Sequence, residues 1–336
     1  MLALVTGGGG FLGQVIARKL VARGDAVRSL ARGDYPALRA EGVETIRGDV
    51  ADRAAVLRAV DGCDVVFHVA AKAGVWGPYA EYHRANVEGT KSVLEACRIA
   101  QVGRLVYTSS PSVVAGVGSG DIEGANESLP YPDRFATSYP RTKAEAERLI
   151  LAANGPDLAT VALRPHLIWG PGDNHLAPRI IARARAGKLR RVGDGTNRVD
   201  SIYVDNAADA HLLAADHLKP GGFECPPAGR AYFISQNDPR PLWDLVNGIL
   251  RAAHLSPVTR SVAPGIAHAA GATLELVHQL LRLPGEPRMT RFVAHQLSAS
   301  HWFATSAATR DLGYSPAISI EEGMSRLERW FDTNPP

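Results

Sequence analysis

The sequence predicts a doubly wound α/β fold built on a mostly parallel sheet, with a smaller lobe formed by the C-terminal half. Three observations predict this architecture. Short apolar runs alternate with helical periodicity through the first half, the first run leads directly into a glycine-rich turn, and clusters of Pro and Gly loosen the pattern after Pro165. Strands that alternate with helices of this length form parallel crossovers, so helices are expected on both faces of the sheet.

The first half carries six candidate strands and four candidate helices. The helical pattern is clearest in the first helix, where Leu12, Ile16 and Leu20 fall on one face and Gly24 is suited to end the helix. The strands are expected at 2–6, 26–30, 43–47, 64–69, 104–109 and 160–163, and the helices near 12–23, 52–60, 81–100 and 141–153.

The C-terminal half is expected to contribute to both units. A strand and helix at 199–217 are suited to return to the sheet, so the first unit is predicted to comprise 1–168 with this segment. The second lobe is predicted to comprise 169–198 and 218–336. Its segment 264–283 is apolar but carries two His, one Glu and one Arg, which is too polar for a transmembrane span. We expect there an amphipathic helix that lines a pocket or an interface, with peripheral membrane contact as the alternative.

Composition excludes several classes of protein. With 336 residues, the chain is long enough for about two folding units without stabilising disulfides. Apolar residues make up 46% and charged residues 21%, which excludes disorder, and a net charge of +3 is too small for a nucleic-acid binder. Cys63, Cys97 and Cys225 show no metal-binding spacing, so no metal is expected. Because an apolar strand begins at Leu2 with no secretory segment before it, a cytoplasmic protein is expected.

The glycine-rich turn indicates a dinucleotide. Gly7, Gly10 and Gly13 follow the first strand and open the first helix with the spacing G-x-x-G-x-x-G. The early glycines permit close approach of the backbone to a pyrophosphate, and the helix N-terminus supplies free N–H groups, here those of Phe11 and Leu12. This context makes the first unit a Rossmann domain.

The end of the second strand favours NADP(H) over NAD(H). The sequence reads Leu30-Ala31-Arg32, with no carboxylate before Asp34 to bind a ribose 2′-hydroxyl. A guanidinium at Arg32 suits a 2′-phosphate; the alternative is a solvated surface charge. The cofactor is expected to be bordered further on by Asp49, Val50, Ala70 and Ala71.

Three side chains suit proton transfer coupled to hydride transfer. Ser110 follows the fifth strand, while Tyr139 and Lys143 lie four residues apart on one helix face. The ammonium lowers the pKa of a phenol that otherwise titrates near 10, so the phenol can exchange a proton with a substrate oxygen held by the serine.

The motifs TGGGGFLG, YTSSPS, YPRTK and LRPHLIWGPGD resemble those of the extended short-chain dehydrogenase/reductase family, over essentially the whole chain. The closest resemblance is to the branch of 3β-hydroxysteroid dehydrogenases and 2-alkyl-3-oxoalkanoate reductases. It implies a catalytic set of Ser110, Tyr139 and Lys143. Ser109 takes the place of Ser110 if the match to the family motif is shifted by one residue. The resemblance also implies that Lys143 contacts the nicotinamide ribose, that Arg164-Pro165 lies beside the nicotinamide, and that a homodimer forms through the helices near 81–100 and 141–153.

Four residues are candidates for substrate contact. Trp76 and Tyr79 follow the fourth strand and would form an apolar wall, while Lys72 and His166 are cations suited to a carboxylate. The alternatives are that Trp76 packs in the core, that Lys72 is a surface charge, and that His166 is a buried imidazole with its own partners.

The resemblance implies an NADP(H)-dependent interconversion of a β-keto and a β-hydroxy group on a lipid-like α-branched acid, of the 2-alkyl-3-oxoalkanoate reductase type. The second lobe, which is apolar and poor in acidic residues, suits a long apolar substrate better than a sugar nucleotide. The first alternative is an NAD(P)-dependent 3β-hydroxysteroid or 4-carboxysterol 3-dehydrogenase that decarboxylates its product. A sugar-nucleotide epimerase and a non-catalytic NADP-binding protein are weaker alternatives, since the lobe is apolar and the Ser–Tyr–Lys set is complete.

Overall fold

The computed structural model describes residues 1–336 and contains a seven-stranded, wholly parallel sheet in the order β12-β7-β5-β4-β1-β2-β3. This confirms the predicted doubly wound class. The strands are β1 (Leu2–Thr6), β2 (Ala26–Ala31), β3 (Glu44–Arg47), β4 (Val65–His68), β5 (Arg104–Thr108), β7 (Ala159–Pro165) and β12 (Arg230–Ile234). The strand order reverses between β1 and β4, which is where ligands of such sheets bind.

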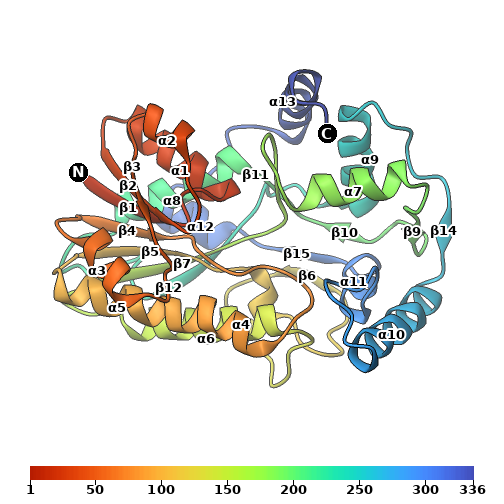
Figure 1. Cartoon of the computed structure of the whole chain (residues 1–336), viewed down its shortest axis with the longest axis horizontal. Coiled ribbons are helices and arrows are strands. Elements are labelled where there is room, and N and C mark those ends of the chain that lie inside the picture. The colour runs from red at the N-terminus through yellow and green to blue at the C-terminus, as the bar shows by residue number, and fades with distance from the viewer.

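Helices cover both faces of the sheet because their apolar stripes pack on strands buried from both sides (Figure 1). One face carries α1 (Phe11–Ala22), α2 (Pro36–Ala40), α8 (Val204–His217) and α12 (Ser306–Leu312). The other face carries α3 (Arg53–Val60), α4 (Tyr79–His83), α5 (Gly89–Ile99) and α6 (Ser138–Ala152). The returning segment therefore lies where it was expected, since α8 packs on α1, β5 and β7.

The predicted helix near 81–100 is divided. Between α4 and α5 lies one turn of π-helix, Arg84–Glu88, which sequence periodicity did not reveal. Turns of π-helix are frequent at functional sites. A short 3₁₀ turn, Pro111–Val114, follows β5.

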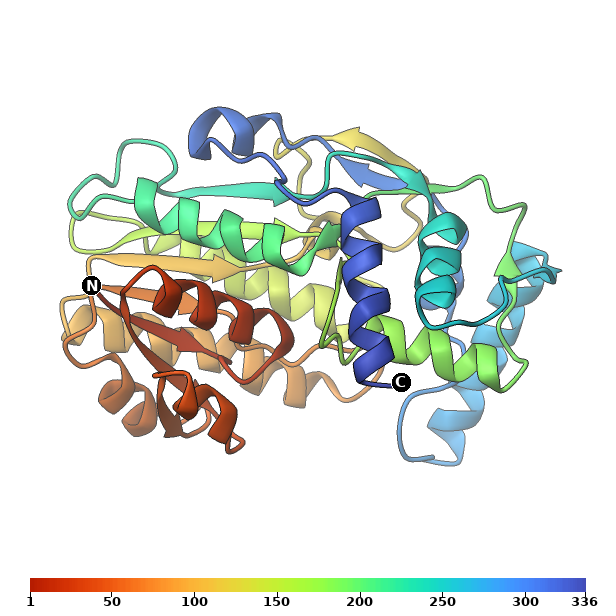
Figure 2. The same cartoon turned by 90° about the horizontal axis from the view of Figure 1, so that it is seen from above.

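The second lobe lies beyond the carboxyl ends of the strands (Figure 2). Its core is formed by residues such as Trp169, Ile249 and Phe331. The helices are α7 (Leu176–Arg185), α9 (Leu242–Ala252), α10 (Pro264–Leu280), α11 (Arg291–Gln296) and α13 (Ile320–Thr333). The short strands are β6 (Ile122–Ala125), β8 (Ile168–Trp169), β9 (Arg191–Val192), β10 (Arg198–Val199), β11 (Ile202–Tyr203), β13 (Arg240–Pro241), β14 (Ser261–Val262) and β15 (His301–Phe303).

The predicted division of the chain needs two corrections. β12 lies within 218–336 but is the edge strand of the large sheet, because its buried residues Tyr232, Phe233 and Ile234 pair with β7. β6 lies within 1–168 but pairs with β15 of the second lobe. The two units thus exchange strands, and no helix of the chain is long and apolar enough to cross a membrane.

Candidate active site

The turn after β1 forms an anion cradle. Gly7 has φ +70°, and a Cβ there would lie 2.8 Å from Ala70 Cα, while a Cβ at Gly13 would lie 2.3 Å from the Gly7 carbonyl oxygen. No L side chain fits at either position without movement of the backbone. Helix α1 begins at Phe11 with no capping side chain and no acidic residue in its first turn. Its first N–H groups therefore remain available to phosphates.

A groove of about 760 Å³ runs from this cradle across the carboxyl ends of the strands. A phosphate cradle at one end and hydroxyl groups at the other fit a dinucleotide. Tyr35, which sequence analysis missed, also lines the groove, and its ring occupies the space a Cβ at Gly9 would need. The groove is lined by every predicted cofactor-binding and catalytic residue: Gly7, Gly10, Phe11, Leu12, Gly13, Arg32, Asp49, Val50, Ala70, Ala71, Ser110, Tyr139, Lys143 and Pro165.

The adenosine end of the groove has excess positive charge. Arg32 is exposed and forms no ion pair, and its carbonyl oxygen accepts a hydrogen bond from Arg47 at 3.1 Å. The nearby carboxylate of Asp34 is paired with Arg39. Two guanidinium groups thus flank this end of the groove without a free carboxylate between them.

Asp49 holds the loop after β3. One of its carboxylate oxygens accepts from Ala51 N at 3.0 Å, and the other pairs with Arg84 at 3.1 Å. The carboxylate is 27% exposed and borders the groove. It therefore retains accessible acceptor capacity at the edge of the predicted adenosine site.

A buried network of three side chains joins β1, β4 and α5, and ends on a backbone carbonyl of the π-helical turn. Thr90 Oγ1 donates to the Asn86 carbonyl oxygen at 2.6 Å, so it accepts from His68 Nε2 at 2.9 Å. The opposite ring nitrogen of His68 then accepts from Thr6 Oγ1 at 2.8 Å. Burial lowers the pKa of His68 to about 3, with Lys143 nearby acting in the same direction, so the ring is neutral. Thr6 Oγ1 also accepts from Ala70 N at 3.3 Å and so orients the wall of the groove.

Asn86 fixes the loop that follows β4. Its Oδ1 accepts from Lys72 N at 2.7 Å, and its Nδ2 donates to Lys72 O at 3.1 Å and to Thr142 Oγ1 at 3.0 Å. The side chain is buried between α6 and the loop. Asn86 was not among the predicted residues, because an Asn inside a helical pattern indicates neither a π-helical turn nor the partners of its side chain.

Helix α6 presents Tyr139, Lys143 and Glu147 at intervals of four residues, which places them along one face. Lys143 is 1% exposed, donates to the Thr108 carbonyl oxygen and lies 4.1 Å above the Tyr107 ring centroid. Burial lowers the pKa of Lys143 to about 7, and Glu147 opposes this shift. The Lys143 amine and the Tyr139 side chain thus both line the groove.

Tyr139 and Ser110 face the same part of the groove. Burial raises the pKa of the Tyr139 phenol, while the neighbouring Ser110 hydroxyl partly opposes the rise. Ser110 Oγ lies 2.9 Å from Ser112 Oγ and accepts from Ser112 N at 3.2 Å. Ser109 also borders the groove, but its hydroxyl is buried without a partner. The geometry favours Ser110 as the serine that acts with Tyr139.

The pair Arg164-Pro165 is divided between two environments. Pro165 lines the groove, as the resemblance implies. Arg164 points instead toward α6, where it donates to Glu147 through Nε at 3.0 Å and Nη2 at 2.6 Å. Both side chains are buried, and Tyr131 also donates to Glu147 at 2.6 Å. Arg164 therefore supports the helix that carries Tyr139 rather than lining the groove.

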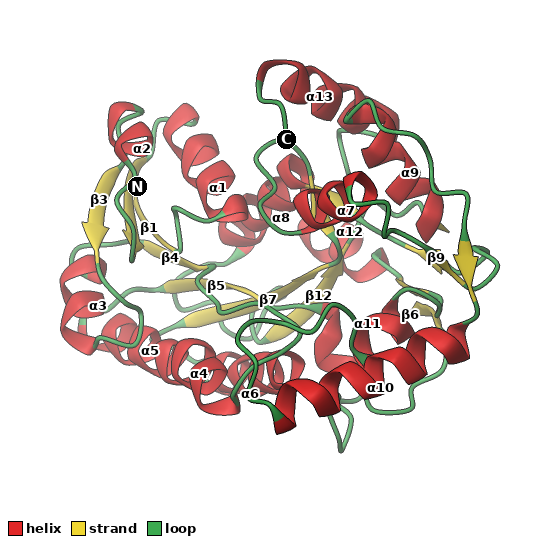
Figure 3. Cartoon of the chain, turned by 45° about the vertical axis from the view of Figure 1, so that its right-hand side comes forward, coloured by secondary structure: helices red, strands yellow, loops and turns green.

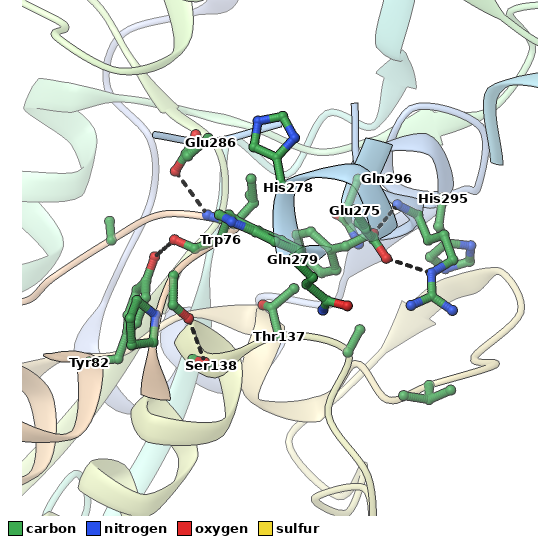
Figure 4. A pocket seen from close by; sticks show the side chains of 18 of the residues that line it. Trp76, Tyr82, Thr137, Ser138, Glu275, His278, Gln279, Glu286, His295 and Gln296 are labelled. Carbon is green, nitrogen blue, oxygen red and sulfur yellow. Dashed lines mark hydrogen bonds and ion pairs between the residues drawn. The ribbon is translucent and has the colours of Figure 1, made fainter. Parts of the chain in front are cut away.

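A second cavity of about 1040 Å³ (Figure 4) adjoins the groove, with which it shares Lys72, Ala73 and Glu81. It lies between α10, α11 and the loop before α4. Lys72 borders both cavities and is paired with Glu81, and Trp76 borders the second cavity with its ring edge-on to His278 at 6.3 Å between centroids. These two predicted substrate residues therefore lie at a cavity.

Two other substrate predictions require correction. Tyr79 borders neither cavity; its hydroxyl donates to Glu145 on α6 at 2.8 Å and Arg141 stacks on its ring. His166 is buried with both ring nitrogens engaged, one by Asp200 and the other by His301 at 3.2 Å. This is the alternative stated above for His166, although its partners, which are distant in the sequence, could not be named in advance.

The chain matches known proteins over nearly its whole length. The profile of the 3-beta hydroxysteroid dehydrogenase/isomerase family matches residues 4–262. A 2-alkyl-3-oxoalkanoate reductase of Stenotrophomonas maltophilia is 53% identical, with 98% of each chain covered. The protein of the same name from Shewanella oneidensis is 50% identical over 97% of this chain and 85% of its own length. A 3beta-hydroxysteroid-dehydrogenase/decarboxylase of Arabidopsis thaliana is 37% identical over 86% of this chain and 67% of its own.

Solved structures share the fold. That of gox2253 has a TM-score of 0.78 and 25% identity over 99% of this chain and 98% of its own. MoeE5 in complex with UDP-glucose and NAD has a TM-score of 0.75 and 25% identity over the full length of both chains. The chain therefore belongs to the 3-beta hydroxysteroid dehydrogenase/isomerase family, within the extended short-chain dehydrogenase/reductases, and is an oxidoreductase.

Proposed function

We propose that this protein is an NADP(H)-dependent reductase of the 2-alkyl-3-oxoalkanoate type, which interconverts a β-keto and a β-hydroxy group on a lipid-like α-branched acid. The observation that carries the proposal is the Ser110–Tyr139–Lys143 set in a dinucleotide groove that shares a wall with a second large cavity. Identities of 53% and 50% to two reductases of that name support the substrate class.

The residues divide the chemistry of reduction among them. Ser110 donates a hydrogen bond to the keto oxygen, and Tyr139 transfers its phenolic proton to that oxygen as the carbon–oxygen double bond is reduced. Lys143 stabilises the resulting phenolate through its charge. A bound dinucleotide would supply the hydride from its nicotinamide, and the N–H groups of Phe11 and Leu12, which line the groove, would hold its phosphates. In the oxidative direction the proton returns to Tyr139.

The proposed preference for NADP(H) depends on Arg32. Its guanidinium is unpaired at the adenosine end of the groove, Arg47 lies beside it, and Asp34 is neutralised by Arg39. This arrangement attracts a 2′-phosphate and leaves the 2′-hydroxyl of NAD without a carboxylate acceptor.

We assign the second cavity to the substrate, with Trp76 as part of its wall and Lys72 near the carboxylate. A homodimer through α4, α5 and α6 is proposed on the resemblance alone. A cytoplasmic location stays a prediction of the sequence.

The second candidate function is 3β-hydroxysteroid or 4-carboxysterol oxidation with loss of carbon dioxide. The identity of 37% to a plant 3beta-hydroxysteroid-dehydrogenase/decarboxylase favours it. Both candidate substrates place a secondary alcohol β to a carboxyl carbon, so the same catalytic residues serve either.

The test is to compare initial rates with a long-chain 2-alkyl-3-hydroxy acid and a 4-carboxy-3β-hydroxysterol, each with NADP⁺ and NAD⁺. We expect turnover of the open-chain acid with NADP⁺ preferred, and loss of that preference by about tenfold or more in Arg32→Ala, as expected for one phosphate contact. Arg98→Ala, an exposed arginine on α5, is the matched control. Tyr139→Phe should lose turnover but bind NADP⁺. Turnover of the sterol alone would establish the second candidate, and a preference for NAD⁺ would refute the role of Arg32.

A further inference from the structure

Helix α10 is attached to the rest of the protein along a narrow stripe. Its buried residues are Ala267, Gly271 and Glu275, spaced four apart on one side. A Cβ at Gly271 would lie 2.6 Å from the backbone of Thr290, and Glu275 accepts from the N and Nε of Arg291, each at 2.7 Å. The helix therefore packs against the start of α11 and is otherwise peripheral, at the edge of the molecule in every view (Figures 1–3).

The side of α10 turned away from this stripe is apolar and exposed. Ile266, Leu276, Leu280 and the following Leu281 are exposed by 63%, 55%, 71% and 66%, and they are half of the eight large apolar side chains exposed on the protein. Helical spacing places uncharged residues between them. We call this surface the α10 outer face: Ile266, Ala269, Ala270, Thr273, Leu276, Val277, Leu280 and Leu281.

The polar residues of α10 lie on another side. His268 lines the second cavity, as do Glu275, His278 and Gln279, which Figure 4 labels. One helix thus separates a large cavity from an apolar exterior. Contiguous exposed apolar surface of this kind marks a site of interaction with a protein or a lipid.

Positive charge flanks helix α10 at both ends. Arg260 precedes the helix, and Arg282 and Arg288 follow it; all three are exposed, none forms an ion pair, and Arg282 also borders the second cavity. The acidic neighbours are already engaged, since Glu275 pairs with Arg291 and Glu286 with Arg179. In a two-fold pair of copies, arginines would meet arginines whichever way the helices crossed, so this charge pattern opposes self-association.

We propose that the α10 outer face docks on an anionic lipid surface. The leucines enter the boundary between headgroups and acyl chains, the helix lies parallel to the surface, and Arg260, Arg282 and Arg288 contact lipid phosphates. The second cavity, which α10 borders, then lies next to the lipid. Delivery of long-chain substrate from the lipid to that cavity rests on the proposed function, whereas the docking itself does not.

Sedimentation of the full chain with vesicles tests the docking without any turnover. The vesicles contain phosphatidylcholine alone or with phosphatidylglycerol. We expect binding to the anionic vesicles that weakens with salt. It should fall about tenfold or more in Leu276→Gln/Leu280→Gln, which removes buried apolar contact, and also in Arg282→Gln/Arg288→Gln. Ile99→Gln, another exposed apolar residue but on α5, should bind as the wild type does.

Circular dichroism establishes that the variants are folded, as expected for exposed positions. Binding that is absent, or that persists undiminished in Leu276→Gln/Leu280→Gln, would overturn the proposal. So would a dimer, seen by sedimentation equilibrium, that the same variant dissociates, because the face would then bind a second copy. Each of these results is independent of the kinetic test of the proposed reaction.

Discussion

Tyr107 is a positioning residue for Lys143. Its ring lies 4.1 Å from the Lys143 Nζ in a fully buried setting, and its own hydroxyl has no partner. The ring face favours the charged amine by about 1–2 kcal/mol when both groups are desolvated. Tyr107→Leu should therefore lower the pKa of Lys143 further below the value of about 7 and weaken its support of the Tyr139 phenolate.

The measurement is the pH profile of kcat/KM in the oxidative direction, which needs the phenolate. We expect the midpoint to move upward by about 0.5–1 pH unit in Tyr107→Leu, since one unit corresponds to about 1.4 kcal/mol. Tyr107→Phe keeps the ring and loses only the unpaired hydroxyl, so its midpoint should not move. Equal shifts in the two variants would show that the ring face plays no part.

Single residues were predictable where local spacing alone carries the chemistry. Gly7, Tyr139 and Lys143 are recognised from their neighbours in the sequence, and all three line the groove. The role of a residue such as Asn86 depends on partners brought together by the fold, which no local pattern contains. The error at Tyr79 has the same cause, because a position in a loop does not determine the direction of a side chain.

The π-helical turn before α5 holds the loop after β4 in place through the side chain of Asn86. Asn86→Ala removes three buried hydrogen bonds that tie the loop after β4 to the turn and to α6. Unpaired polar groups then remain buried, which should lower the free energy of unfolding by about 2 kcal/mol or more. Because this loop forms one wall of the groove, we also expect the Kd for NADP⁺ to rise roughly tenfold.

Urea unfolding and fluorescence titration with NADP⁺ measure the two effects. Ser92→Ala on α5 is the control, since it removes one hydrogen bond to the last carbonyl of the same turn, that of Glu88, and does not touch the loop. It should leave the Kd unchanged. An Asn86→Ala variant that binds NADP⁺ as the wild type does would show that the loop is held by other contacts.

Regular elements were largely predictable from periodicity. The six strands and the helix α1 lie within one or two residues of their expected positions, because buried runs and apolar stripes reflect burial directly. Two-residue strands such as β9 and β14 are too short to show an alternation of apolar and polar residues. Their pairing also joins segments that are distant in the sequence.

At the scale of the whole molecule, topology predicted where the groove lies, whereas the substrate cavity is assembled from distant parts of the chain. The loop at 72–82, the segment 115–118 and helix α10 all border that cavity. The exchange of β6 and β12 between the units has the same origin: both are short runs whose partners lie far away in the sequence. Local sequence patterns do not predict which distant segments pair with one another.

The returning helix α8 is joined to the sheet by a buried histidine, which makes the stability of the whole molecule depend on pH. His211 donates from Nδ1 to the Ala207 carbonyl oxygen at 2.7 Å, and its Nε2 lies 2.8 Å from Thr108 Oγ1 on β5. Burial lowers the pKa of His211 to about 4, below its value near 6.5 in the unfolded chain. The unfolded chain therefore binds the proton more tightly, and stability is full above pH 6.5 and is lost as the pH falls toward 4.

Between pH 6.5 and 5 this one histidine should account for about 2 kcal/mol of lost unfolding free energy. Urea unfolding at the two pH values measures the loss in the wild type and in His211→Gln, where the loss should be smaller by about that amount. The comparison uses the change between the two pH values, so a general destabilisation by the substitution does not affect it. His217→Gln, on an exposed position of the same helix, should retain the wild-type pH dependence. If His211→Gln and His217→Gln lost the same unfolding free energy as the wild type, the link between β5 and α8 would not be the group that titrates.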